Sequence, residues 1–359
     1  MATHERAGKP TWISIRPRGG LVSYRVDRRV PLVALALVVF TIVVASISIA
    51  YGQYNISPLD VVRTVLQINQ DHPDYANLSL VVHTFRLPRV VLSFLIGMAL
   101  AASGTIMQGI TRNPLADPFL LGVSSGASLA AVAIIVVVKT VSTSALPWAA
   151  FGGALLTAFT IYTLAWKNGS SSPIRLILIG VALQSLFGAL ITVMLLFGDI
   201  NDVQQAYVWM TGSVYGRNWE HVHALGGWLI VFLPLALLMA RQLNILGLGD
   251  ETARGLGARV EIQRITLLVV SVALAAAAVA VAGTIGFVGL VAPHAARRLV
   301  GPAHEGLLPV SALLGGALLV LADLLGRSVI APGELPIGIV TAVIGAPYFL
   351  YLFYRYRNA

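Results

Sequence analysis

The sequence has no cysteine and few charged residues. Among its 359 residues none is Cys and 11% are Asp, Glu, Lys or Arg, whereas soluble domains carry about 25% charged residues. The missing cysteines exclude disulfides and thiolate metal sites. The low charge, together with 57% hydrophobic residues, excludes an ordinary soluble domain, so we predict a membrane protein.

Apolar residues occur in runs close to the ~20 residues that a helix needs to cross a ~30 Å hydrocarbon core. The sequence lacks the alternating segments of about 10 residues that are typical of transmembrane strands. We therefore predict an all-α polytopic membrane protein with about ten transmembrane helices. The predicted spans are 31–50, 89–110, 118–138, 147–166, 175–197, 220–240, 264–283, 286–300, 306–326 and 336–354.

The first thirty residues are polar and basic, and we interpret 1–30 as a cytoplasmic segment ahead of a single membrane domain, 31–359. A cleaved signal peptide is disfavoured because the apolar run that follows is about twice as long as an h-region. The eighth span is short, and its stretch "AGTIGFVGLVAPH" favours a helix that is broken or re-entrant among its glycines.

Lysine and arginine are distributed unevenly between the two sides of the predicted membrane domain. If the N-terminus is inside, eighteen of the 24 lie at cytoplasmic span ends and six at external ones. Cytoplasmic loops are enriched in these residues, so the count predicts that both termini are cytoplasmic. It also explains the net charge of +9 without a nucleic-acid partner.

Sites for chemistry are lacking. Gly283, Gly286 and Gly289 do not form a phosphate loop, because no strand precedes them and no Gly-Lys-Ser/Thr follows. The histidines are scattered over different loops and span ends, which disfavours a metal site or a catalytic triad. Few acidic residues lie in the middle of spans, and this disfavours an ion-coupled secondary transporter, which remains an alternative.

The stretch "TFRLPR" places Arg86 and Arg89 around a proline, at the predicted external start of the second span. One interpretation is that these long side chains reach the membrane interface and mark a helix end. The other is a fixed fork that binds the carboxylates of a partner protein. Arg327 extends this patch, or forms a local pair with Asp323 four residues earlier.

Two further segments are informative. Residues 244–264, "NILGLGDETARGLGARVEIQR", combine small and charged residues and predict a short helix, a turn and a second helix that another protein could approach closely; a solvated loop is the alternative. In "RNPLADPFLLGVSSGASL", the Asn-Pro and Asp-Pro pairs predict turns. Ser124, Ser125 and Ser128 then indicate tight helix packing or, as an alternative, a polar pathway lining.

Six motifs, in order, resemble the FecCD family of iron-chelate and cobalamin permeases of binding-protein-dependent ABC importers. They are "RLPR", "ASGTIMQGITRNPLADPFLLGVSSGA", "LGDETARGLG", "AGTIGFVGLVAPHAARRL", "ADLLGR" and "ELPIGIVTAVIGAPYFLYL". The resemblance implies a permease subunit in the cytoplasmic (inner) membrane, with ten helices and no cofactor of its own. It implies as partners a second permease subunit, identical or paralogous, two ATPase subunits that bind ATP and Mg, and an extracytoplasmic substrate-binding protein.

The resemblance also assigns roles to residues. It implies binding-protein docking at Arg86, Arg89 and Arg327, and ATPase coupling, within the cytoplasmic segment 244–264, at Gly249, Asp250, Ala253, Arg254, Leu256 and Gly257. Pathway or gate positions are Asn113, Leu115, Ser171, Ser172, Gln184, Ser185, Thr192, Thr341 and Gly345. One gate departs from the pattern: Pro173 and Ile174 stand where relatives have small hydroxyl residues, and the serines just upstream are the candidate substitutes.

The predicted function is therefore a permease subunit, not an enzyme, that moves a ferric siderophore into the cytoplasm. Cobalamin and haem are alternative cargos within the same family. A membrane scaffold without transport activity is a further alternative, in which 249–257 is only a loop.

Overall fold

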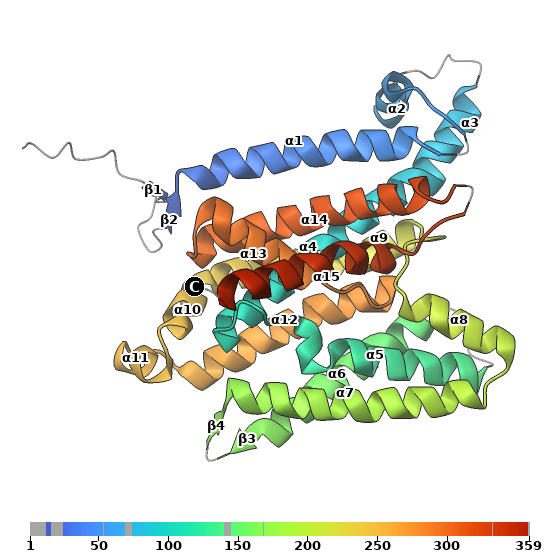
Figure 1. Cartoon of the computed structure of the whole chain (residues 1–359). Coiled ribbons are helices and arrows are strands. Elements are labelled where there is room, and N and C mark those ends of the chain that lie inside the picture. The colour runs from blue at the N-terminus through green and yellow to red at the C-terminus, as the bar shows by residue number, and fades with distance from the viewer. Residues whose placement is uncertain are drawn as a thin grey trace, which may run out of the picture.

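The computed structural model describes residues 12–15, 24–52, 54–68, 74–139, 145–167, 169–331 and 333–357. Helices dominate (Figure 1). The longer ones are α1 (Arg29–Ala50), α4 (Leu87–Thr111), α5 (Val123–Val132), α6 (Ala145–Ala165), α7 (Pro173–Leu196), α8 (Ile200–Met210), α9 (Trp219–Leu238), α12 (Val260–Ala282), α13 (Val288–Val300), α14 (His304–Ser328) and α15 (Ile337–Arg357). The short ones are α2 (Pro58–Val65), α3 (Tyr75–Ser79), α10 (Ala240–Gly247) and α11 (Asp250–Gly255).

Three helical stretches depart from α geometry, and two small hairpins complete the fold. The stretches η1 (Leu80–Arg86) and η3 (Ala133–Val138) are π-helical, and η2 (Pro118–Leu121) is a 3₁₀ turn. Antiparallel pairs join β1 (Trp12–Ile15) to β2 (Tyr24–Asp27) and β3 (Trp166–Lys167) to β4 (Ser170–Ser171). The helical prediction is confirmed for most of the chain, and the two hairpins were not predicted.

Each of the ten predicted spans falls on a helix. In the described part of the chain, seven helices are long and apolar enough to cross a membrane, and 123–138 and 337–351 are shorter apolar helices. The eighth predicted span is the 13-residue α13. The chain leaves helical geometry at 283–287 just before it, so the predicted break is confirmed. The number of membrane crossings stays a prediction.

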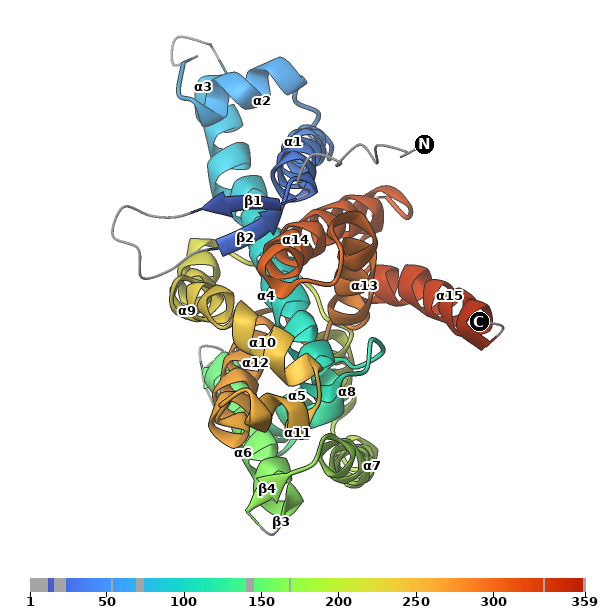
Figure 2. The ribbon, with the colours of Figure 1, turned by 90° about the vertical axis from the view of Figure 1, so that its left-hand side faces the viewer.

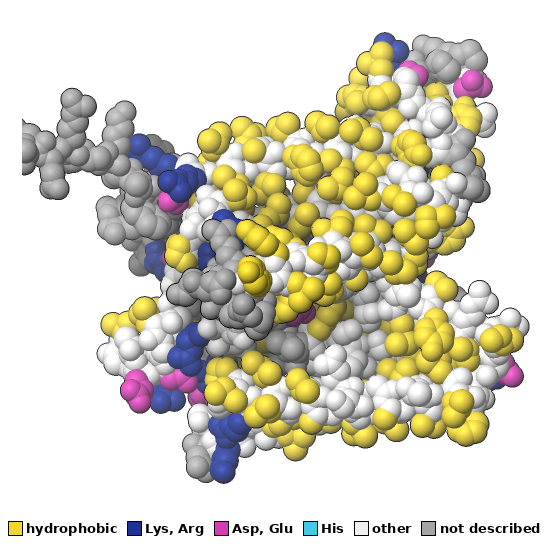
Figure 3. All heavy atoms as spheres, in the orientation of Figure 1, with side chains coloured by type: hydrophobic (Ala, Val, Ile, Leu, Met, Phe, Trp, Pro, Cys, Tyr) yellow, Lys and Arg dark blue, Asp and Glu magenta, His cyan; other side chains and the backbone are white. Residues whose placement is uncertain are grey.

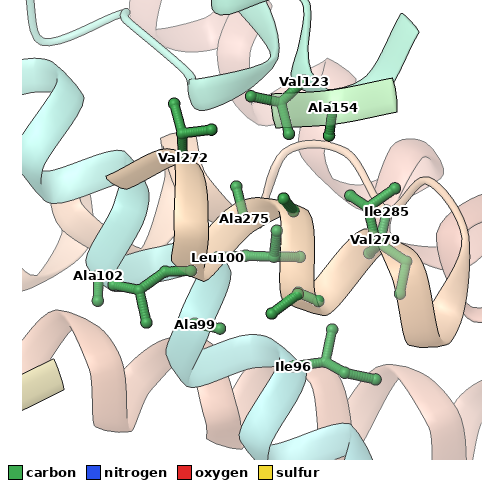
Figure 4. Packing of buried hydrophobic residues seen from close by; sticks show 14 of the residues in the cluster. Ile96, Ala99, Leu100, Ala102, Val123, Ala154, Val272, Ala275, Val279 and Ile285 are labelled. Atoms are coloured by element: carbon green, nitrogen blue, oxygen red, sulfur yellow. The ribbon is translucent and has the colours of Figure 1, made fainter. Parts of the chain in front are cut away.

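The centre of the molecule consists of α4, α12 and α14, which pack through small side chains. In Figure 4, Ile96, Ala99 and Leu100 of α4 lie among the side chains of α12. A Cβ on Gly97 would lie 2.1 Å from the carbonyl oxygen of Gly315 in α14, so only glycine permits this helix contact. Such small-residue seams are how apolar helices associate inside lipid.

The same packing explains the serines and glycines that follow α4. A Cβ on Gly126 of α5 would lie 2.6 Å from the carbonyl oxygen of Gly153 in α6. Ser128 is buried on the same helix, whereas Ser124 and Ser125 are half-buried. The predicted tight packing is therefore confirmed for this helix pair.

The outer helices expose apolar faces. In the apolar 18-residue stretch of α1 and in that of α7, 17% of the residues are buried, whereas 83% are buried in the corresponding stretch of α12. Figure 3 shows hydrophobic side chains spread over the flank of the molecule, and Figure 2 shows α7 and α15 projecting from it. Faces of this kind fit lipid or another membrane subunit.

The two ends of the bundle differ in charge and composition. One end, here called the α11 end, carries α10, α11, both hairpins and the C-terminal end of α15; the other, the α2 end, carries α2, α3 and α8 (Figure 1). In Figure 3 most Lys and Arg side chains gather at the α11 end. The segments nearest to both chain termini thus lie at the more basic end.

One local prediction is wrong. Arg86 and Arg89 do not stand at the start of a helix, because the chain is helical without interruption over Tyr75–Thr111. Pro88 lacks an N–H and would clash with a carbonyl one turn earlier in a regular helix. The preceding turn is π-helical, and the N–H of Leu87 donates to Val82, five residues back, so the helix passes through the proline instead of beginning there.

Candidate coupling site and docking surface

The segment between α9 and α12 folds as two short helices at the α11 end. α10 and α11 are separated by Leu248 and Gly249, as predicted for a helix, a turn and a second helix. Gly249 has φ +101° and Gly257 has φ +82°, conformations that side chains with a Cβ rarely adopt. Glycine is therefore required on both sides of α11. Figure 2 shows α10 and α11 standing in front of the bundle when it is seen from this end.

The side chains of α11 divide into an inner and an outer set. Ala253 is completely buried, so it supports the fold and cannot contact another protein. Leu256 is 64% exposed and Leu248, just before α11, is 58% exposed. Glu251 and Arg254 are also exposed. The outer surface therefore combines two apolar side chains with charges of both signs.

Asp250, the first residue of α11, faces inward and contacts two arginines. An oxygen of its carboxylate lies 2.7 Å from a terminal nitrogen of Arg264 on α12, and another contact of 3.2 Å joins it to Arg112, the residue after α4. Both oxygens of Asp250 accept from the same Arg264 nitrogen, at 2.7 and 2.8 Å. These contacts fix α11 against α4 and α12.

Arg264 also reaches the candidate gate ahead of α7. Its other terminal nitrogen donates to the carbonyl oxygen of Ser171 and to Glu261, each at 2.7 Å. Glu261 in turn accepts from the hydroxyl of Ser171 at 3.0 Å and from its N–H at 3.2 Å. Sequence reasoning did not assign a role to Arg264 or Glu261; their spacing of three residues on one helix face was the only available signal.

The remaining gate candidates lie close by. Ser172 is the N-cap residue of α7 and Pro173 its first residue, which suits the fixed φ of proline. In the connection after α4, the side-chain oxygen of Asn113 accepts from the N–H of Leu115 at 2.9 Å, a local turn. The structure therefore places Ser171 and Ser172 beside the network of Arg264, and Asn113 directly after Arg112.

Asp117 ends this connection in a poorly hydrated position. One carboxylate oxygen accepts from the N–H of Phe119 at 2.9 Å, and the other lies 3.2 Å from where a Cβ on Gly289 would be. Burial, only partly offset by the hydrogen bond from Phe119, raises the pKa of Asp117 to about 6. Desolvation disfavours the charged carboxylate, so the folded protein favours the protonated form of Asp117.

The three predicted docking arginines come together at the α2 end, but mostly with partners in this chain. Arg89 donates to Asp323 at 2.9 and 3.0 Å and to Glu334 at 2.8 Å. Arg327 lies 3.3 Å from Asp323, so the local pair considered from the sequence is present. Arg86 donates to backbone carbonyls after and at the end of α1, including Tyr54. None of the three forms a free fork in solvent.

A cleft of about 370 Å³ adjoins this arginine cluster. It is lined by Tyr51, Gly52, Asn55, Arg327, Ala331, Gly333 and Glu334. Glu334 is 33% exposed, whereas the side chains of Arg89 and Arg327 are 13% and 10% exposed. An incoming carboxylate would therefore meet Arg327 and Glu334 first.

The predicted pathway residues fall into two groups. Gln184, Ser185 and Thr192 are exposed on α7. Thr341 and Gly345 of α15 are buried instead, and a Cβ on Gly345 would lie 2.4 Å from that of Phe287. The first group can line a water-filled path beside α7, whereas the second packs α15 against the start of α13.

The described residues contain no group of three or more His, Asp or Glu arranged to hold a metal ion. The arrangement at each end consists of charge pairs, exposed apolar side chains and glycine turns. Such features support contact with other proteins and movement between packed elements.

Comparisons with known proteins agree over nearly the whole chain. The profile of the FecCD transport family matches residues 38–355. The iron(3+)-hydroxamate import permease FhuG of Bacillus subtilis is 44% identical over 330 residues, covering 90% of this chain and 96% of that protein. The cobalamin import permease BtuC of Halobacterium salinarum is 47% identical over 272 residues, covering 76% of this chain and 73% of that protein.

A solved structure gives the same result for the fold. A metal-chelate type ABC transporter in an inward-facing conformation superimposes with a TM-score of 0.81 at 32% identity, covering 90% of this chain and 99% of that one. The chain therefore belongs to the FecCD transport family and is a membrane permease subunit of an ABC importer, whose ATPase activity belongs to a separate subunit.

Proposed function

We propose that this permease moves a ferric siderophore across the cytoplasmic (inner) membrane into the cytoplasm. The observation that carries the proposal is the relation to the iron(3+)-hydroxamate permease, which holds at 44% identity over 96% of that protein. The transporter contains two permease subunits, identical or paralogous, and two ATPase subunits that bind ATP and Mg. An extracytoplasmic binding protein delivers the chelate, and lipid surrounds the outer helices.

The α11 end is the cytoplasmic side in this proposal, and α11 is the contact to an ATPase subunit. Its support is the basic character of this end (Figure 3) and the pair of exposed side chains Leu248 and Leu256. Apolar side chains at the centre of a small patch with charged neighbours are typical of protein interfaces. Closure of the two ATPases on ATP would then displace α11.

The α2 end is the docking side for the binding protein. Its cleft presents Arg327 beside Glu334, so an acidic side chain from a partner can take the place of Glu334 at the arginines. Arg89 binds Asp323, which in turn contacts Arg327 of the cleft. Docking in this form exchanges one charge-assisted contact for another, which favours a reversible complex over a permanent one.

The pathway runs along α7 at the boundary between the two permease subunits. The exposed face of α7 carries the three polar candidates Gln184, Ser185 and Thr192 among large apolar side chains. A path of this composition binds cargo weakly. Weak binding suits an importer, because a site that held the chelate tightly would bind it in both access states and slow its release.

Cobalamin is the second candidate cargo, supported by the 47% identity to a cobalamin permease over 272 residues. Uptake distinguishes the two. Cells that lack this chain, and the same cells with it restored, are given radiolabelled iron as several siderophores and, separately, labelled cobalamin. Restored uptake of one ferric chelate supports the proposal. Uptake restored only for cobalamin, or for haem, contradicts it while leaving the permease role intact.

A further inference from the structure

Asp250 joins two elements that lie far apart in the sequence. It is the first residue of α11, and its carboxylate contacts Arg112 after α4 and Arg264 on α12. Arg112 directly precedes Asn113 and the turn to Leu115. Asp250 therefore contacts two arginines next to gate candidates. Arg112 directly precedes Asn113, and Arg264 donates to the carbonyl oxygen of Ser171.

Arg264 fixes the geometry of the second connection. Its side chain is 1% exposed and is among the largest fully buried side chains of the described residues. A buried guanidinium is stable only while its partners remain in place. Its two terminal nitrogens bond Asp250 on one side and Glu261 and the Ser171 carbonyl on the other. A movement of Asp250 therefore either carries Arg264 along or leaves a buried charge unpaired.

The hairpin that contains Ser171 is attached firmly to the start of α7. Ser171 pairs with Trp166 across the β3–β4 hairpin. The N–H of Leu176 donates to the carbonyl of Ser172 at 3.0 Å, and Arg175 donates to the carbonyl of Ser170 at 3.0 Å. Displacement of Ser171 thus displaces the first turn of α7, the helix that carries the exposed polar candidates.

We propose that Asp250, Arg264, Glu261 and Ser171 form a polar linkage that transmits the movement of α11 to the gate at the start of α7. Arg264 and Glu261 act as positioning residues, since neither is placed to touch cargo or nucleotide. The inference rests on the proposed role of α11 as the ATPase contact. Figure 2 shows α11, α12 and the β3–β4 hairpin grouped at one end of the bundle, with α7 beginning beside them.

The gate can be followed with a single cysteine, because the chain has none. Leu178 is 64% exposed. It precedes Ser185 by seven residues and Thr192 by fourteen, which is about two and four helical turns, so the three side chains lie on the same face of α7. A Leu178→Cys side chain therefore lies on the proposed pathway face near the gate, and we expect its reaction with a water-soluble thiol reagent to change when the gate opens or closes.

The experiment uses the complete transporter, purified through this chain with its ATPase subunits and placed in liposomes. Labelling of Leu178→Cys is measured without nucleotide and after trapping with ATP and vanadate. The change in labelling rate is normalised to the fraction of complexes that trap nucleotide. In the parental protein we expect a change of at least about fivefold.

Glu261→Gln is the main test variant, because an amide cannot accept from both Arg264 and Ser171 as the carboxylate does. Glu305→Gln is the matched control: Glu305 is also half-buried at this end and accepts from Asn244 at 2.7 Å, but it connects α10 to α14 and not to a gate. Ser171→Ala is a milder second variant that removes one hydrogen bond and is the safer one to fold.

We expect Glu261→Gln to reduce the normalised labelling change to less than about twofold, Ser171→Ala to reduce it by a smaller amount, and Glu305→Gln to retain the parental value. If Glu261 and Ser171 had a purely structural role, their variants would lower the yield or the fraction of complexes that trap nucleotide. The change in Leu178→Cys labelling per trapped complex would then stay at the parental value, and that result would overturn the inference. A parental protein whose labelling does not respond to trapping overturns it as well. No cargo is involved, so failure of chelate uptake would refute the proposed function without deciding this test.

Discussion

At the scale of single residues, the α2 end depends on one buried carboxylate. Asp323 is 2% exposed and lies between Arg89 and Arg327. A carboxylate removed from water is stable only with its partners in place. Arg89 therefore has a structural task in addition to any part in docking, and the two roles cannot be separated by replacing Arg89 alone.

Arg89→Ala should destabilise the protein by about 1–3 kcal/mol, the usual cost of buried acceptors that lose their donor. The loss stays below that of a fully unpaired buried charge because Arg327 remains 3.3 Å from Asp323. Thermal unfolding in detergent measures the effect. The control is Arg63→Ala, which removes a surface pair to Asp60 at 3.7 Å and should cost about 0–1 kcal/mol. Equal, small losses for both variants would contradict the structural role of Arg89.

Asp117 gives a second prediction, because burial raises its pKa to about 6. The folded protein binds this proton more tightly than the unfolded chain, so stability falls as pH rises from about 4 to 6 and stays lower above that range. Asp117→Asn keeps an oxygen for the N–H of Phe119 and removes the charge. The variant should gain up to roughly 3 kcal/mol over the wild type at pH 7.5, and about half of that at pH 5.

Unfolding temperatures at pH 5, 6 and 7.5 test this prediction. The relevant quantity is the gap between Asp117→Asn and the wild type at each pH. A gap that does not widen as the pH rises would mean that the carboxylate is well hydrated in the folded state.

At the scale of elements, α11 is small and is held by features on both sides. Gly249 and Gly257 provide the turns, and Asp250 and Ala253 provide the inner contacts. The exposed side chains Leu248 and Leu256 then remain for a partner. The consequence is that bulky residues at Ala253 test folding, whereas changes at Leu256 test binding.

Leu256→Asp should leave the folded permease in the membrane but weaken its association with the ATPase subunits. Burying a leucine contributes ~1.5–3 kcal/mol, and every 1.4 kcal/mol is tenfold in affinity, so we expect a loss of about tenfold or more in co-purified ATPase. The control is Leu59→Asp on α2, which is 58% exposed at the opposite end. Undiminished ATPase association in Leu256→Asp would remove α11 from the interface.

The elements show what the sequence could and could not predict. Hydrophobic runs and turn residues located ten helices and the α10–α11 segment, because those signals are local. The partner of Arg327 was also foreseeable, four residues away on one helix. The bond between Arg89 and Asp323 joins residues 234 positions apart, and the link from Arg264 to Ser171 spans 93; no local pattern encodes such contacts. The π-helical turn before Pro88 was missed for a related reason, since it depends on how the whole helix packs.

At the scale of the whole molecule, the distribution of charge supports the proposed orientation in the membrane. Basic side chains gather at the α11 end, where the segments nearest to both termini lie (Figure 3). Positive residues are retained on the cytoplasmic side during insertion. In the proposed orientation, the cleft that contains Arg327 and Glu334 at the α2 end faces outside, where a binding protein can reach it.

The helical segment Tyr75–Thr111 makes the orientation testable. Its 37 residues measure about 55 Å at 1.5 Å per residue, far more than the ~30 Å hydrocarbon core, so we expect its first turns to extend beyond the membrane. Thr84 in η1 and Thr252 in α11 are both exposed, at opposite ends. Because the chain has no cysteine, Thr84→Cys and Thr252→Cys each report on one side without background.

In intact cells or spheroplasts, a membrane-impermeant thiol reagent should label Thr84→Cys and leave Thr252→Cys unmodified. Inside-out vesicles should give the opposite result, which controls for a cysteine that is merely unreactive. If Thr252→Cys is labelled from outside and Thr84→Cys is not, the permease is inverted. The arginine cleft would then face the cytoplasm and α11 would face outward, and a contact between α11 and a cytoplasmic ATPase would be physically impossible.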